Sequence, residues 1–150
     1  MLINKGKFIS YQNQFYNKVQ QTPYKIDLEV TEVAQSPMYK EDGEFNLEAF
    51  VGDSPRTSKT YTLRCLYEKD ISDRTREKYG LPKEVNGIVY LSPKQLVPLF
   101  GDYHLDWNRT KVHFEGSVQV INKIIYLEEF KEYGSCVGIQ IFLRDALKGG

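Results

Sequence analysis

The last third of the chain, residues 111–147, constrains the fold most strongly. A β-rich segment covers residues 117–130, and residues 131–135 then form a turn. After the turn, apolar side chains recur at every second position and fall on one face of a returning strand: Val137, Ile139, Ile141 and Leu143. Such alternation is typical of half-buried strands. A long hairpin needs further strands to cover it, so the chain is expected to be mainly β.

Three earlier segments also have strand character, at residues 24–31, 60–67 and 87–91. The first alternates strictly between apolar and charged side chains, and a slip of one residue would bury Lys25 and its charged neighbours. Short strands separated by turns are typical of all-β domains. The sequence therefore predicts a small antiparallel β-barrel or sandwich with one short surface helix and a long loop.

The short helix is expected between Ile71 and Pro82. Ser72 or Asp70 can cap its start, and Gly80 can supply the left-handed residue that ends it. Residues 94–100 are limited by proline and glycine, which predicts a turn of helix or an irregular segment.

A chain of 150 residues corresponds to one domain. Residues 1–22 are polar with scattered aromatic side chains, and they are interpreted as an N-terminal arm, loosely ordered or forming an edge strand. The β-barrel domain is assigned to residues 23–147 and includes a long loop at 36–59 with a possible short strand at 45–51. Residues 148–150 form a C-terminal tail.

The charge balance argues against a strongly cationic nucleic-acid binder. Lys plus Arg and Asp plus Glu each number 20, so the formal net charge is zero. Neutrality weakens repulsion between copies and suits a protein that self-assembles. No apolar run has the length of a membrane span, so a soluble protein made in the cytoplasm is expected. Cys65 and Cys136 lie in strand-like runs and are expected to be buried, reduced thiols.

Three residues that could be catalytic, Asp102, His104 and Asp106, alternate in a turn-rich segment. A histidine between carboxylates can act as a base, but carboxylates that organise turns around a surface histidine explain the pattern more simply. Two isolated cysteines and two isolated histidines lack the spacing of a zinc site. The glutamates at 128, 129 and 132 are expected to form a solvated hairpin tip. No catalytic residue, metal site or cofactor is predicted.

Basic and aromatic side chains interleave between residues 56 and 79. They are Arg56, Lys59, Tyr61, Arg64, Tyr67, Arg74, Arg76, Lys78 and Tyr79. Such a pattern can stack and neutralise single-stranded nucleic acid. Tyrosines on strands also serve as core or interface residues. An OB-like barrel that binds single-stranded nucleic acid therefore stands as an alternative function.

One larger pattern covers residues 60–147. A capped helix at 70–80 precedes an apolar strand at 85–92, and a Trp-containing turn leads into strands around a glycine at 116. A final hairpin ends at 143–145. In strand order and spacing, the chain resembles the small β-barrel head-closure proteins (stopper or head-completion proteins) from the neck of tailed bacteriophages. Tail-terminator and tail-completion proteins of the same neck have a similar size and remain alternatives.

The resemblance implies a structural virion protein without catalysis. Copies would form a homo-oligomeric ring that closes the head exit channel, contacts the portal or adaptor protein above, and contacts the tail terminator or tail tube protein below. Double-stranded DNA would pass through the ring without sequence-specific binding. Aromatic and apolar side chains in the arm, the loop and the Trp turn are the candidate partner contacts: Phe8, Tyr11, Phe15, Met38, Tyr39, Phe45, Phe50 and Trp107.

Overall fold

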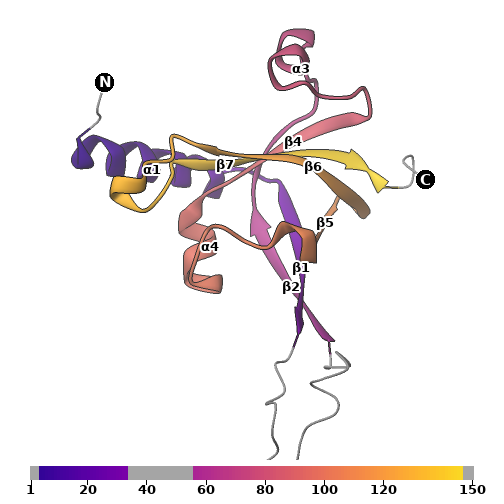
Figure 1. Ribbon diagram of the computed structural model, residues 1–150, viewed down its shortest axis with the longest axis horizontal. Coiled ribbons are helices and arrows are strands. Elements are labelled where there is room, and N and C mark those ends of the chain that lie inside the picture. Colours follow the sequence, from indigo (N-terminus) through magenta and orange to yellow (C-terminus); the bar gives the residue numbers. More distant parts are fainter. Residues whose placement is uncertain (1–3, 34–55, 147–150) are drawn as a thin grey trace, which may run out of the picture.

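In the computed structural model, which describes residues 4–33 and 56–146, seven strands form one antiparallel sheet with the order β2-β1-β5-β6-β7-β4-β3 (Figure 1). The strands are β1 (Lys25–Val33), β2 (Arg56–Arg64), β3 (Leu66–Glu68), β4 (Val85–Leu91), β5 (Thr110–Phe114), β6 (Ser117–Leu127) and β7 (Gly138–Asp145). The sheet is strongly curled. The prediction of a mainly β, antiparallel barrel-like fold is confirmed.

The two edge strands of this sheet are consecutive in the chain. Only Cys65 separates β2 from β3, and its backbone N–H donates to the carbonyl of Tyr24 at 3.0 Å. One bent segment thus pairs with β1 before the bend and with β4 after it. The side chain of Gln95 supports the bend, because its Nε2 donates to the carbonyl of Arg64 while its Oε1 accepts the N–H of Ser92, both at 2.8 Å.

The register of β1 follows its alternating sequence. Ile26 and Leu28 are buried, while Lys25 is exposed, as predicted. β2 pairs with β1 along its full length, from Arg64 to Arg56, whereas β5 pairs only between Ile26 and Val30. The outer end of β1 and β2 therefore continues beyond the sheet as a two-stranded ribbon, which points away from the rest of the molecule in Figure 1.

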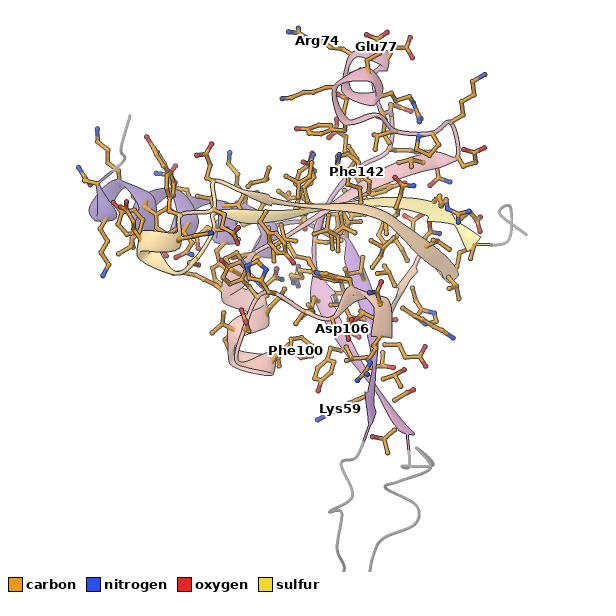
Figure 2. The ribbon with its side chains drawn as sticks, in the orientation of Figure 1. Lys59, Arg74, Glu77, Phe100, Asp106 and Phe142 are labelled. Atoms are coloured by element: carbon orange, nitrogen blue, oxygen red, sulfur yellow. The ribbon has the colours of Figure 1, made fainter. Side chains whose placement is uncertain are left out.

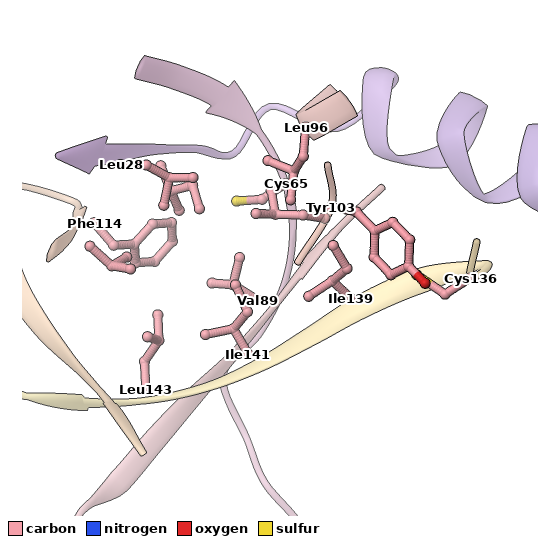
Figure 3. Close-up of a cluster of buried hydrophobic side chains, with 13 residues drawn as sticks. Leu28, Cys65, Val89, Leu96, Tyr103, Phe114, Cys136, Ile139, Ile141 and Leu143 are labelled. Carbon is pink, nitrogen blue, oxygen red and sulfur yellow. The ribbon is translucent and has the colours of Figure 1, made fainter. Parts of the chain in front are cut away.

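Strand β7 is the centre of the core. Its odd-numbered residues Ile139, Ile141 and Leu143 contact the main hydrophobic cluster inside the curl (Figure 3). On the opposite face, Phe142 belongs to a second cluster. Figure 2 shows Phe142 between the sheet and helix α3 (Asp73–Tyr79), and the ring of Tyr79 lies 5.2 Å from it. β7 is therefore buried on both faces.

Helix α3 is the surface helix that the sequence predicts. Ser72 caps its first turn through its side-chain oxygen, which accepts the N–H of Thr75 at 3.2 Å. Gly80 ends the helix in the left-handed conformation with φ 62°. Arg74 and Glu77 extend away from the sheet in Figure 2.

Two further helices accompany α3: the first was not expected, and the second is the helical form that was one of two expected for residues 94–100. Residues expected to form a loose arm or edge strand form helix α1 (Lys5–Gln20), capped by Asn4. Phe8, Phe15 and Val19 recur at helical spacing and face the sheet, which outweighs the many Asn and Gln side chains. Residues 93–100 form helix α4 (Pro93–Phe100), which begins with a capping box between Ser92 and Gln95.

The expected loop at 36–59 also needs a correction. Residues 56–59 belong to strand β2, because their backbone continues the ladder with β1 as far as Val33. The possible short strand at 45–51 and the tail at 148–150 lie outside the described residues.

The buried thiols predict a loss of stability at alkaline pH. Burial raises the pKa of Cys65 and of Cys136 from 9.0 to about 12. The folded state therefore favours the neutral thiols, and this contribution is complete below pH 9 and is lost as the pH rises toward 12. We expect the free energy of unfolding, measured in urea, to fall across this range, and to fall less in a Cys65→Ala/Cys136→Ala variant. Thiolate absorbance that appears near pH 9 in the folded protein contradicts this assignment.

Candidate functional site

A cluster of aromatic and polar side chains surrounds His104, in the segment before the 3-10 helix η1 (Trp107–Arg109). The Nε2 atom of His104 lies 2.6 Å from Oε2 of Glu129, and the hydroxyl of Tyr103 donates to the same oxygen at 2.8 Å. Trp107 donates from Nε1 to the hydroxyl of Tyr126 at 2.9 Å. The His104 ring lies 4.3 Å from that of Tyr126. These contacts fasten the segment to the end of β6.

The carboxylates nearest to His104 in sequence do not pair with its ring in the structure. Asp102 accepts the backbone N–H of His104 at 3.1 Å and so organises a turn, while Asp106 pairs with Arg109 at 3.4 Å. Burial is the main reason that the pKa of Tyr103 lies far above its ordinary value, and the hydrogen bond to Glu129 raises it further. The hydroxyl of Tyr103 is therefore a stable donor. The sequence could not identify Glu129 as the histidine's partner, because the contact depends on how β6 ends.

A replacement tests whether His104 has more than a local role. His104→Ala removes one hydrogen bond at a half-exposed position, so we expect a loss of about 0.5–1 kcal/mol in the free energy of unfolding, measured by urea denaturation. Self-association should stay at the level of the unchanged chain. Loss of an enzymatic activity found in the unchanged chain would instead assign a catalytic role to His104.

A groove lies between helices α1 and α4. It has a volume of about 470 Å³ and is lined by Gln12, Tyr16, Pro93, Lys94, Val97, Pro98 and Ser135. Gln12 fixes α1 beside the turn that precedes β7, because its Nε2 donates to Ser135 Oγ at 2.8 Å and to the Cys136 carbonyl at 3.0 Å. Lys94 spans the groove, since its Nζ donates to Asn13 and lies 5.9 Å from the centre of the Tyr16 ring.

The rim of the groove exposes large apolar side chains. Val97 on α4 lines the groove and is 43% exposed. Ile9 is 42% exposed and stands two helical turns before Tyr16, so it lies on the groove side of α1. Exposed apolar surface of this kind, gathered beside a groove, is typical of interaction sites. We therefore take the groove, with Ile9 and Val97, as the candidate functional site.

The structure separates the predicted partner contacts into three groups. Phe8 is only 2% exposed and packs against Phe130, with ring centres 5.6 Å apart, so its assignment as a partner contact is wrong. Phe15 and Trp107 are half-buried in packing contacts within the chain. Tyr11 is 47% exposed and remains accessible. Four further candidates, Met38, Tyr39, Phe45 and Phe50, lie outside the described residues.

Val97, the exposed apolar rim residue of α4, is a functional candidate that the sequence does not single out. The signal was the apolar run at residues 96–100, which is longer than one buried helix face requires. Within an eight-residue helix only one side can face the core, and here Leu96 takes that side. Val97 is the next residue, so it faces outward and lines the groove.

The basic and aromatic residues of the alternative function are spread over several elements. The rings of Tyr61, Tyr67 and Tyr79 pack against Phe100, Phe114 and Phe142 respectively. Arg64 and Arg76 donate to backbone carbonyls at 2.9 and 3.0 Å. These tyrosines are thus packing residues rather than members of one exposed stacking surface.

Comparison with known proteins found no matching family model, no matching curated protein and no matching solved structure. Over residues 4–33 and 56–146, no helix combines the length and apolar character needed to cross a membrane. In the same ranges, no group of three or more His, Cys, Asp or Glu side chains is placed to hold a metal ion.

Proposed function

We propose that this protein is a structural component of a tailed-phage neck, where copies form a ring that closes the head exit channel. The ring connects the portal or adaptor protein to the tail. The observation that carries the proposal is the groove between α1 and α4 with its exposed rim, because a ring requires each copy to present a binding surface to its neighbour. The resemblance to head-closure proteins in strand order is the reason that we assign this ring to a phage neck.

The rest of the fold supports this role. The curled sheet with strand β7 buried on both faces is a rigid scaffold, and the ribbon of β1 and β2 projects from it. One surface hollow over β1, β5 and the turn after β5 is lined by Asp27, Glu29 and Glu115 together with Lys25 and His113. A surface with this mixed, mainly acidic charge lets DNA pass without firm binding to its phosphates.

A charge placed in the groove should prevent assembly. We expect Val97→Glu to weaken self-association at least tenfold in sedimentation velocity runs at several concentrations, because it buries a carboxylate at an apolar contact. Val97 is 43% exposed, so the fold should tolerate the change. Val118→Glu is the matched control, since Val118 is 39% exposed on strand β6 and does not line the groove. Equal weakening by both variants would count against the groove.

A second measurement separates the proposal from the nucleic-acid alternative. The purified chain should show no salt-dependent binding of a fluorescent single-stranded oligonucleotide, because its basic side chains are dispersed and balanced by carboxylates. Tight binding that weakens steeply with salt, by a chain that stays monomeric, would favour the OB-like alternative.

A further inference from the structure

We propose that the groove between α1 and α4 of one copy binds residues 34–55 of a neighbouring copy. This inference rests on the proposed ring and names the contact that builds it. Residues 34–55 join the end of β1 to the start of β2, and the pairing of Val33 with Arg56 fixes both ends at one point. The occupant is thus one continuous segment whose two flanking residues are paired with each other.

The chemistry of this loop complements that of the groove. Residues 34–55 contain five carboxylates and only one lysine. They also contain six large apolar side chains: Met38, Tyr39, Phe45, Leu47, Phe50 and Val51. A segment of this composition can place apolar side chains on apolar surface and carboxylates beside lysines.

The groove presents the opposite charge. Lys94 is the only charged residue among the described residues that line it, and an ammonium group that donates to Asn13 retains further donors. Helix α1 carries three lysines, Lys5, Lys7 and Lys18, and no carboxylate. Lys5 stands two turns before Gln12 and therefore lies on the same side of α1. A desolvated carboxylate next to Lys94 would fix the register of the bound segment.

The position of the ribbon favours a neighbour over the same copy. Tyr61 of β2 packs against Phe100 at the end of α4, with ring centres 4.7 Å apart. From Tyr61 the strand continues for five residues to Arg56, roughly 17 Å at the usual rise of a strand. The tip of the ribbon therefore lies well beyond its own α4, and Figure 1 shows the ribbon pointing away from α1. Such a head-to-tail contact uses two different surfaces and can close into a ring.

Complementation between two full-length variants tests the contact. One variant, Val97→Glu, has an altered groove and an intact loop. The other, Phe45→Asp/Phe50→Asp, has an altered loop and an intact groove. We expect each alone to associate at least tenfold more weakly than the unchanged chain. An equimolar mixture should form a one-to-one pair and stop there, because each pair contains one working groove and one working loop.

Native mass spectrometry with one variant labelled with ¹⁵N identifies the mixed pair. Val118→Glu and Asn46→Asp/Ala49→Asp are the controls, since they add the same charge while leaving Val97, Phe45 and Phe50 unchanged. Thermal unfolding of each variant confirms that it is folded.

Each other outcome has a distinct meaning. If both variants still form rings as the unchanged chain does, this contact is wrong while the ring proposal stands. If both variants lose assembly and the mixture gives no pair, the loop does not bind the groove of a neighbour, and the inference is overturned. If the unchanged chain stays monomeric at every concentration, the inference and the proposed function both fail.

Discussion

Replacing Ile141 by Ala should lower the free energy of unfolding by about 2–5 kcal/mol, the largest effect that we expect from one substitution. Ile141 is fully buried in the middle of β7, which lies between β6 and β4 in the sheet. The substitution removes methyl and methylene groups from a site enclosed by the main core. Neighbouring strands on both sides are held by their ladders and cannot easily collapse into the space.

Urea denaturation of the two proteins measures this difference. Val118→Ala serves as the control, because an exposed side chain on β6 should change the free energy of unfolding by no more than about 0.5 kcal/mol. A loss below about 1 kcal/mol for Ile141→Ala would mean that this face of β7 is not the core of the domain.

Replacing Gly138 by Ala should destabilise the protein by about 1–3 kcal/mol, because the site has no room for a methyl group. A Cβ atom on Gly138 would lie 2.7 Å from two ring carbons of Phe15. Phe15 belongs to α1, so the methyl group displaces the Phe15 ring, or the helix that carries it, from the start of β7. The same movement should disturb the groove between α1 and α4 and weaken self-association.

A double-mutant cycle shows whether this contact is the cause. In a Phe15→Ala background the ring is absent, so Gly138→Ala should cost much less than in the unchanged chain. We expect a coupling energy of about 0.5–3 kcal/mol from chemical denaturation of the four proteins. A full cost that persists without the Phe15 ring would assign the effect to the backbone of β7 and remove support for the docking of α1.

The strands were predictable because their information is local. Alternation fixed the register of β1, and the spacing of Ile139, Ile141 and Leu143 identified the buried face of β7. Ser72 and Gly80 marked both ends of α3. Each of these signals depends on one side chain and its immediate neighbours along the chain, so no knowledge of distant contacts was needed.

Helix α1 was missed because tertiary packing determines it. Its many Asn and Gln side chains and its aromatic residues have only moderate helix propensity. The three apolar positions that face the sheet become informative once Gly138 is known to leave space for Phe15. The closure of the sheet at Cys65 was also hidden, because a single predicted strand at 60–67 gives no indication that it bends and pairs on two sides.

The candidate site was the least predictable part. The groove exists only because α1 and α4, which are far apart in sequence, lie side by side and are joined by Lys94 and Asn13. Two aromatic residues of the N-terminal segment that were both predicted to contact a partner differ in the fold, since Phe8 is buried and Tyr11 is exposed. Hydrophobicity alone cannot tell an anchor inside the chain from one that meets a partner.

Electron microscopy of the purified full-length protein, over a range of concentrations, tests the account most directly. If each copy binds the next through unlike surfaces, the images should show closed rings with a central opening, and these should disappear with Val97→Glu but not with Val118→Glu. Particles that remain single copies at every concentration, or paired copies related by a twofold axis with no opening, would contradict it.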